Sequence, residues 1–368
     1  MKSMIKAAEK RAKKMAKDDK EFEEFLASHV PKIKVVGVGG AGGNTAMRLL
    51  EMGVVGADLI AVNTDAQDLS KIKANSKILI GREATKGLGA GSDPSVGEEA
   101  AKEDEAQIRK SIGNADLTFV TAGMGGGTGS GAAPVVAEVA KKSGALTIGV
   151  VTVPFDNEGL LRWENARYGL ERLKSQVDAV IVIPNQRLLD IVPDLPITTA
   201  FRVADEILAN AVRGITRMVT SQGLVNVDFA DLKAVMTNAG GALIGVGESD
   251  SEKRAGEAVE KAVNNPLLDL DIKGSKGALV YIEGGKDLKL EEAYKVVDLV
   301  SQHLSHDAKL IWGVGLPDES LGHTLKVIVI VTGANIKEFY HPQNAELEER
   351  EKARMSKDLG IEFIEVEE

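Results

Sequence analysis

The chain contains no cysteine in its 368 residues. Disulfide bonds, thiolate metal sites and a cysteine nucleophile are therefore excluded. Aromatic residues make up only 4% of the chain, so we expect cores built from valine, isoleucine, leucine, alanine and methionine. No run approaches the roughly 18 apolar residues of a membrane span, and the amino terminus lacks the apolar segment of a secretion signal. These absences predict a cytoplasmic protein without direct membrane insertion.

An excess of basic residues is also missing. The 45 lysines and arginines are outnumbered by 55 aspartates and glutamates, which gives a formal net charge of −10. Proteins that bind nucleic acid generally present a basic face, so no nucleic-acid partner is expected. The pattern G-x-x-x-x-G-K-S/T is absent as well, which excludes a Walker-type nucleotidase with its phosphate-binding lysine. A hydrophobic content of 43% over this length predicts two domains.

Glycine, in contrast, is abundant and clustered. Residues 125–131 include five glycines and two hydroxyl side chains, between a strand pattern at 117–120 and an apolar helical stripe that starts at Pro134. Glycines let the main chain approach an anion, their N–H groups turn toward it, and the following helix offers its positive end. A flexible linker is the alternative, but a linker does not lie between a strand and a helix only a few residues apart. We interpret this run as a phosphate-binding loop.

A second glycine-rich segment, residues 37–43, follows a strand pattern at 35–38 and precedes a helix. Its residues Gly37, Gly39 and Gly42 fit the fingerprint G-x-G-x-x-G, and Asp58 or Asp65 lies near the distance of a ribose-binding acid. An NAD-dependent oxidoreductase is therefore one interpretation. A dinucleotide needs only one helix N-terminus for its pyrophosphate, so two glycine loops favour a longer polyphosphate.

Strand-like and helical segments alternate through residues 33–200. The apolar runs that predict strands are residues 35–38, 59–62, 78–80, 117–120, 146–153 and 179–183. Such alternation is typical of an α/β fold, in which helices cover both faces of a mainly parallel sheet. We assign residues 33–200 to a nucleotide-binding domain.

The remaining segments surround a second unit. Residues 201–222 predict a long central helix with apolar groups on more than one side, which suits a position between two domains. Residues 223–335 predict a smaller α+β domain. Residues 1–32 predict a charged helical extension, and residues 336–368 predict an acidic linker that ends in an apolar peptide.

Seven motifs follow one another along the chain, at residues 39–44, 63–65, 87–91, 125–131, 154–162, 183–185 and 226–231. In this order they resemble FtsZ, the tubulin-like GTPase family of prokaryotic cell division, and match its archaeal members closely. The resemblance covers about residues 33–335. It implies a tubulin/FtsZ-type fold, a GTP-binding domain, a GTPase-activating second domain, and hydrolysis of GTP to GDP and phosphate. Mg²⁺ would accompany the nucleotide, although no protein ligand for it can be assigned.

Carried over residue by residue, the resemblance implies a GTP pocket assembled from several segments. The phosphate-binding residues would be Gly40, Ala41, Gly42, Gly43, Asn44, Gly125, Gly126, Gly127, Thr128, Gly129 and Ser130. The same pocket would be lined by Asn63, Asp65, Gly89, Ala90 and Gly91. Glu158 would contact the ribose and Arg162 would lie near the phosphates; without the resemblance, both could equally be exposed loop charges.

The same resemblance implies that Asn185 and Asp205 read the guanine base, with Phe201 as the stacking ring. Guanine presents its N1–H and N2–H₂ donors on one edge, and an ionised carboxylate accepts from both. Adenine does not offer that pair. The plain alternatives are a solvated helix charge for Asp205 and a core ring for Phe201.

Asp228 and Asp231 lie three residues apart, so they share one face of a helix. From the residues alone, Asp228 is an N-cap and Asp231 a charge that favours the helix dipole. The resemblance implies instead that both, with Asn226, enter the nucleotide pocket of a neighbouring subunit and position or polarise the attacking water. A monomer should then hydrolyse GTP poorly.

A contact between opposite ends of two copies is heterologous, and without ring closure it produces a filament. The implied partner is thus the chain itself, in a head-to-tail polymer at the division site. The terminal residues that suit binding to a membrane-anchoring division protein are Leu359, Ile361, Phe363 and Ile364. Ile361 and Phe363 alternate with Gly360 and Glu362, and this pattern favours addition of a strand to a sheet edge of the partner. A frayed, inert tail is the alternative. A nucleotide-binding protein that assembles without catalysis is a third possibility for the whole chain.

Overall fold

The computed structural model describes residues 30–187, 197–220, 223–264, 275, 277–305 and 307–334. The expected amino-terminal helix lies almost wholly outside these residues, as does the apolar peptide at residues 359–364. Within the described part of the chain, no helix has the length and apolar character needed to cross a bilayer.

One sheet of ten strands runs through the described residues in the order β3-β2-β1-β4-β5-β6-β7-β10-β8-β9. Its first six strands are β1 (Ile33–Val38), β2 (Ala57–Asn63), β3 (Ser76–Leu79), β4 (Leu117–Gly123), β5 (Leu146–Val153) and β6 (Ala179–Pro184). All of these pair in parallel, which confirms the predicted α/β fold. Their carboxyl ends therefore meet at one edge of the sheet.

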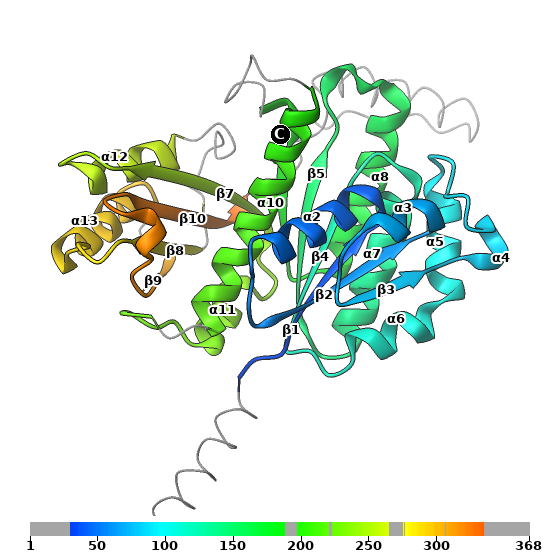
Figure 1. Ribbon diagram of the computed structural model, residues 1–368, viewed down its shortest axis with the longest axis horizontal. Coiled ribbons are helices and arrows are strands. Elements are labelled where there is room, and N and C mark those ends of the chain that lie inside the picture. The colour runs from blue at the N-terminus through cyan, green and yellow to red at the C-terminus, as the bar shows by residue number, and fades with distance from the viewer. Residues whose placement is uncertain are drawn as a thin grey trace, which may run out of the picture.

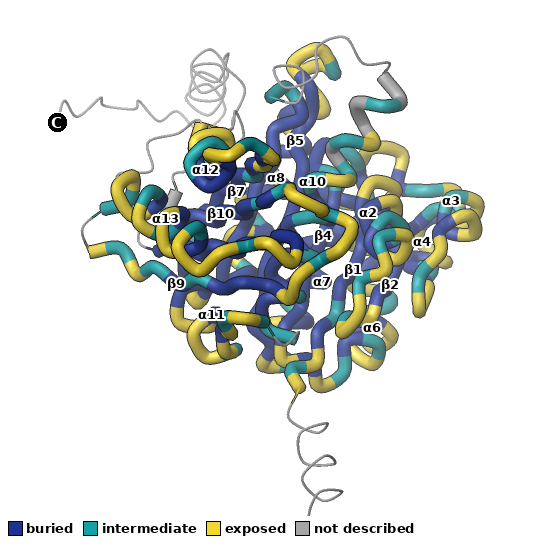
Figure 2. Tube along the Cα trace, turned by 60° about the vertical axis from the view of Figure 1, so that its left-hand side comes forward, coloured by how far each residue is buried: buried dark blue, intermediate teal, exposed yellow. Residues whose placement is uncertain are grey.

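Helices cover both faces of this parallel part (Figure 1). They are α2 (Gly39–Glu51), α3 (Ala66–Lys71), α4 (Arg82–Thr85), α5 (Pro94–Glu103), α6 (Glu105–Ile112), α7 (Gly127–Lys142) and α8 (Leu160–Gln176). The strands are buried and the outer faces of the helices are exposed (Figure 2). As composition predicts, the two large apolar clusters consist mostly of valine, isoleucine, leucine and alanine.

Helix α7 begins at Gly127, so the prediction of a start at Pro134 is wrong by about two turns. Pro134 lies inside the helix. The reason is close packing: a Cβ added at Gly131 would lie 2.0 Å from the carbonyl oxygen of Pro94 in α5. The glycine run thus forms the first turns of a buried helix, and contact with α5 outweighs the low helix propensity of glycine.

Helix α10 (Ile197–Thr220) lies between the parallel part and the second unit (Figure 1). A Cβ added at Gly56, just before β2, would lie 3.0 Å from the Thr220 hydroxyl. The carboxyl end of α10 is therefore at the amino ends of the parallel strands, and the helix runs back along the sheet.

The second unit contains α11 (Phe229–Met236), β7 (Gly240–Ser249), α12 (Arg254–Val263), β8 (Gly277–Gly284), α13 (Leu290–Ser301), β9 (Lys309–Val314) and β10 (Leu325–Ala334). Strand β10 is antiparallel to β7 and β8, whereas β8 and β9 are parallel. A short parallel pairing of residues 179–181 with 240–242 joins β6 to β7. The two large apolar clusters continue through this junction, so residues of both units share each of them.

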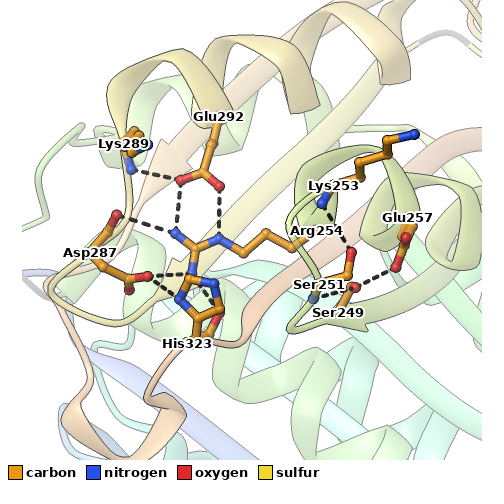
Figure 3. A network of polar contacts seen from close by, with 9 residues as sticks. All are labelled: Ser249, Ser251, Lys253, Arg254, Glu257, Asp287, Lys289, Glu292 and His323. Carbon is orange, nitrogen blue, oxygen red and sulfur yellow. Dashed lines mark hydrogen bonds and ion pairs between the residues drawn. The ribbon is translucent and has the colours of Figure 1, made fainter.

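A buried arginine fastens the outer part of the second unit (Figure 3). The Arg254 side chain is 3% exposed, and its guanidinium donates to both carboxylate oxygens of Glu292, at 2.7 and 2.9 Å. It also donates to Asp287 Oδ2 at 2.8 Å, and the His323 ring contacts the same carboxylate. This network ties the start of α12 to the segment that leads into α13.

Candidate functional site

A pocket of about 260 Å³ lies at the carboxyl ends of β1, β4, β5 and β6. Its lining residues are Val38, Gly39, Gly40, Ala41, Gly123, Met124, Gly126, Gly127, Thr128, Gly129, Thr152, Pro154, Glu158, Arg162, Asn185 and Asp205. Ten of them are among the residues expected from the sequence: Gly40, Ala41, Gly126, Gly127, Thr128, Gly129, Glu158, Arg162, Asn185 and Asp205. Segments far apart in sequence thus meet because parallel strands end at the same edge.

Two helix N-termini face this pocket. Helices α2 and α7 begin at Gly39 and Gly127, and neither has a side chain that caps its first N–H groups. A Cβ added at Gly39 would lie 3.2 Å from the Gly129 nitrogen, so the two glycine turns are in close contact. Gly39 and Gly125 have φ of +73° and +106°, which favours glycine at both turns. Uncapped N–H groups and two positive helix ends form a site suited to an anion such as phosphate.

Three expected phosphate-binding residues pack behind the turns. A Cβ at Gly42 would lie 2.3 Å from the Thr121 carbonyl oxygen, and one at Gly43 would lie 3.1 Å from Ile72. Ser130 Oγ accepts the Gly125 N–H at 2.8 Å, which holds the loop in shape. Absence of a side chain at Gly42 is therefore a packing requirement.

The expected segments 63–65 and 89–91 lie next to the pocket. Thr64 Oγ1 is 2.7 Å from the hydroxyl of Thr128, which lines the pocket. Asp65 caps α3 through the Asp68 N–H, and Asn63 Nδ2 donates to Asp68 at 3.0 Å. The Gly89 N–H donates to the Thr64 carbonyl. Of the other expected residues, Ala90 is buried beside Gly127, whereas Asn44 and Gly91 are exposed.

Glu158 and Arg162 form an ion pair at one side of the pocket. Glu158 Oε1 also accepts the Phe155 N–H at 2.7 Å, which fixes the turn before α8. Arg162 keeps a side chain that is 53% exposed and available to a ligand. A carboxylate and a guanidinium are thus held together at the pocket entrance.

Asn185 and Asp205 supply oxygen acceptors on the far side. Asn185 is buried, and its Oδ1 has no hydrogen-bond partner within the described residues. Burial raises the pKa of Asp205 to about 7, and the positive charge of Arg48 opposes that rise. Two desolvated side chains to whose oxygens the described residues supply no donor are suited to a ligand with adjacent N–H groups. The Phe201 side chain lies outside the described part of the structure.

Six lining residues were not among those expected in the GTP pocket: Val38, Gly39, Gly123, Met124, Thr152 and Pro154. Of these, Gly39 was named only in the dinucleotide fingerprint and as the start of a motif, and Pro154 only as the start of a motif. All six lie at or just beyond the carboxyl ends of strands. Their position after predicted strands was a usable signal. Asn165 was also missed; its side-chain amide donates to the Ser92 carbonyl at 2.8 Å and to the Gly125 carbonyl at 3.4 Å, which links two loops around the pocket.

The acidic residues 228 and 231 lie away from this pocket. Asp205 and Thr220 are 15 residues apart on α10, which corresponds to about 22 Å along a helix. Asp228 follows the far end of α10, and its Oδ1 accepts the Asp231 N–H at 2.7 Å, so it caps α11 as one reading of the sequence predicted. Asn226, which accepts the Gly223 N–H, is exposed, as are both aspartates.

Asp58, one candidate for a ribose-binding acid in the NAD reading, is far from the glycine turns. Asp58 is the second residue of β2, at the amino end of the strand, and Lys34 Nζ lies 2.6 Å from its carboxylate. Asp65 is occupied as a helix cap. Among the described residues, no three histidine or carboxylate side chains gather into a potential metal site. The geometry therefore favours a nucleotide with several phosphates over a dinucleotide.

Comparison with known proteins gives consistent matches along the chain. Residues 32–193 match the Tubulin/FtsZ family GTPase domain, and residues 240–335 match the FtsZ family C-terminal domain. The chain is 57% identical to cell division protein FtsZ 1 of Thermococcus kodakarensis, over 86% of this chain and 84% of the relative. It is 49% identical to FtsZ of Methanothermobacter thermautotrophicus, over 98% and 97%. A solved FtsZ dimer from M. jannaschii has a TM-score of 0.83 at 54% identity, covering 87% of this chain and 93% of that chain.

Proposed function

Because this chain belongs to the tubulin/FtsZ family of GTPases, and within it to the FtsZ cell-division proteins, we propose that it polymerises head to tail and hydrolyses GTP where two subunits meet. GTP binds in the pocket at the carboxyl ends of the parallel strands. Asp228 and Asp231 of the neighbouring subunit complete the active site by orienting the attacking water. The filament forms part of the division ring, at the inner face of the membrane.

One observation carries the proposal: the pocket holds phosphate-binding turns and base-reading acceptors, but the described carboxylates beside those turns are already engaged. Asp65 accepts the Asp68 N–H, and Asp68, which lies beside Gly40, accepts from the Asn63 amide. The carboxylates that line the pocket, Glu158 and Asp205, lie on the ribose and base sides in this assignment. The exposed pair, Asp228 and Asp231, is at the opposite end of α10. A second copy is needed to bring them together, and the dimer of the M. jannaschii relative supports self-association.

Mg²⁺ would enter with the nucleotide and neutralise charge on the phosphates. The described residues fit this role because they offer hydroxyls at Thr64 and Thr128 beside the turns and no carboxylate cluster that would bind the ion alone. Mg²⁺ often keeps water and phosphate oxygens as most of its ligands. The protein then contributes the backbone N–H groups of α2 and α7, together with Arg162.

Replacement of Asp228 by Asn tests the catalytic assignment. We expect GTP binding to remain within about twofold, because Asp228 is outside the pocket of its own subunit, and turnover to fall at least 100-fold.

Two further measurements test the ligand and the assembly. Titration with GTP, ATP and NADH identifies the ligand, and light scattering with GTP and Mg²⁺ reports assembly. Full turnover in Asp228→Asn would contradict the division of the active site, and flat scattering at micromolar protein would contradict the filament.

We further propose that the apolar peptide at residues 359–364 binds a membrane-anchoring division protein by strand addition. Deletion of residues 359–368 should leave GTP-dependent scattering unchanged, since it removes no residue of the pocket or of the acidic pair, and should abolish recruitment to that partner. Recruitment of the truncated chain at the level of the full chain would identify the segment as an inert tail.

A further inference from the structure

Helix α2 connects the phosphate side of the pocket with α10. Its first turn supplies Gly40 and Ala41 to the phosphate side. Two turns later, Arg48 reaches across to α10, where its Nη2 lies 3.1 Å from Glu206 Oε2. Glu206 is the neighbour of Asp205, which lines the base side of the pocket. One helix is therefore fixed to the phosphate turn and to the base-reading end of α10.

Among the described residues, Arg48 is the cation that forms an ion pair at this end of α10. Lys326 of β10, whose Nζ lies 3.4 Å from Asn210 Oδ1 on α10, also interacts electrostatically with Glu206. The Arg48 side chain is 29% exposed and also pairs with Glu51 on its own helix, at 3.3 Å. Charged side chains on the elements around Asp205 are Arg48 and Glu51 on α2, Glu158 and Arg162 across the pocket, Arg187 after β6, and Arg202 and Glu206 on α10. Strand β5 carries no titratable residue. Strand β8 carries Tyr281, whose pKa burial raises to about 12, and Glu283, which pairs with Arg213 and Arg217 further along α10.

We propose that Arg48 is a positioning residue for guanine recognition. Its ion pair with Glu206 holds the pocket end of α10 against α2, and its positive charge favours the carboxylate form of Asp205. Only that form accepts from both N1–H and N2–H₂ of guanine. This inference rests on the proposed GTP site and adds a residue outside the pocket lining to its specificity. In agreement, Arg48 is the charged group that lowers the pKa of Asp205 against the effect of burial.

The test compares Arg48→Met with Glu51→Gln in the full chain. Dissociation constants of GDP and of inosine diphosphate, which lacks the 2-amino group, are measured between pH 6 and 8.5. Their ratio cancels the titration of the phosphates and reports how well the base edge is read. In Arg48→Met we expect the pH at which the ratio is half-maximal to rise by about half a unit and GDP affinity at pH 7 to fall about threefold. Glu51→Gln breaks the other ion pair of Arg48 and should keep the wild-type profile.

Arg48→Lys keeps the positive charge but changes the shape of the side chain. If the charge is what matters, this variant should restore the pH profile at least in part. Thermal unfolding of each variant shows that it is folded at the assay temperature. A wild-type profile in Arg48→Met overturns the inference. The Asp205→Asn variant distinguishes the two levels: if it retains the wild-type ratio, base reading by Asp205 fails and the inference falls with it. If it loses the ratio while Arg48→Met keeps it, only the role of Arg48 is wrong.

Discussion

The Asp205 side chain is desolvated where it lines the pocket, and burial raises its pKa to about 7. In the nucleotide-free protein its ionised form lacks donors within the described residues, so its carboxylate opposes folding. A guanine base would supply two N–H donors and favour ionisation. Desolvation of Asp205 therefore lowers the stability of the nucleotide-free protein and leaves the carboxylate without competing donors when guanine binds.

Replacement of Asp205 by Asn should therefore stabilise the nucleotide-free protein. A group whose pKa is raised by folding contributes its full stability below the unfolded value near 4, and this contribution is lost as the pH rises through about 7. The gain in Asp205→Asn is then largest above pH 7, at roughly 2–4 kcal/mol, and smaller at pH 5. Urea unfolding at pH 5 and pH 8 measures it. Equal stability of the two proteins at pH 8 would mean that the carboxylate is well solvated.

At the scale of elements, the contact between α5 and α7 depends on missing side chains. Gly97 of α5 and Gly131 of α7 face the opposite backbone so closely that added Cβ atoms would lie 2.3 Å from Gly127 O and 2.0 Å from Pro94 O. Glycine is unfavourable within a helix, by about 1 kcal/mol relative to alanine. Here it allows α7 to carry its uncapped first turn into the pocket beside α2.

Replacement of Gly131 by Ala should destabilise the protein by about 1–3 kcal/mol, because the new methyl group overlaps a backbone oxygen that is fixed within α5. The matched control is Gly256→Ala in α12, where the nearest atom is the flexible end of Lys295, 4.0 Å away. That change should stabilise by about 0.5–1 kcal/mol. Thermal or urea unfolding separates the two, and similar effects at both positions would show that α5 moves aside.

The same helices show what the sequence could predict. The apolar runs at 35–38 and 117–120 identified β1 and β4 because both strands are buried almost throughout. The start of α7 was missed, since local propensity argued against a helix of glycines and the packing partner, α5, is some 30 residues away. Lining residues such as Gly123 and Thr152 belong to none of the motifs. They enter the site only because they lie at the carboxyl ends of parallel strands.

At the scale of the whole molecule, α10 places the nucleotide pocket and the acidic pair at opposite ends. Asp228 could be predicted as a helix cap from its own neighbours, and the structure confirms that role. Its proposed second role depends on another copy of the chain, which no property of the single sequence displays except through resemblance. If the active site is divided in this way, a mixture of two different inactive variants should regain activity.

Two inactive variants should complement each other when mixed. Asp228→Ala keeps its pocket, whereas a variant with a blocked pocket, such as Gly129→Val, keeps its acidic pair; a Cβ at Gly129 would lie 2.2 Å from Gly123 O. With random head-to-tail contacts at equal amounts, at most about a quarter join a sound pocket to a sound acidic pair. GTPase activity should thus return toward that fraction. Absence of any rescue, with both variants folded and assembling together, would contradict the divided site.

In the proposed filament, the direction of α10 would make the two ends different. The last subunit at one end would have an open nucleotide pocket that can release GDP and take up GTP from solution. The last subunit at the other end would expose Asp228 and Asp231, while its own nucleotide would be enclosed by the next subunit. In such a filament, nucleotide would exchange at one end only, and GDP would accumulate in the interior as the filament ages.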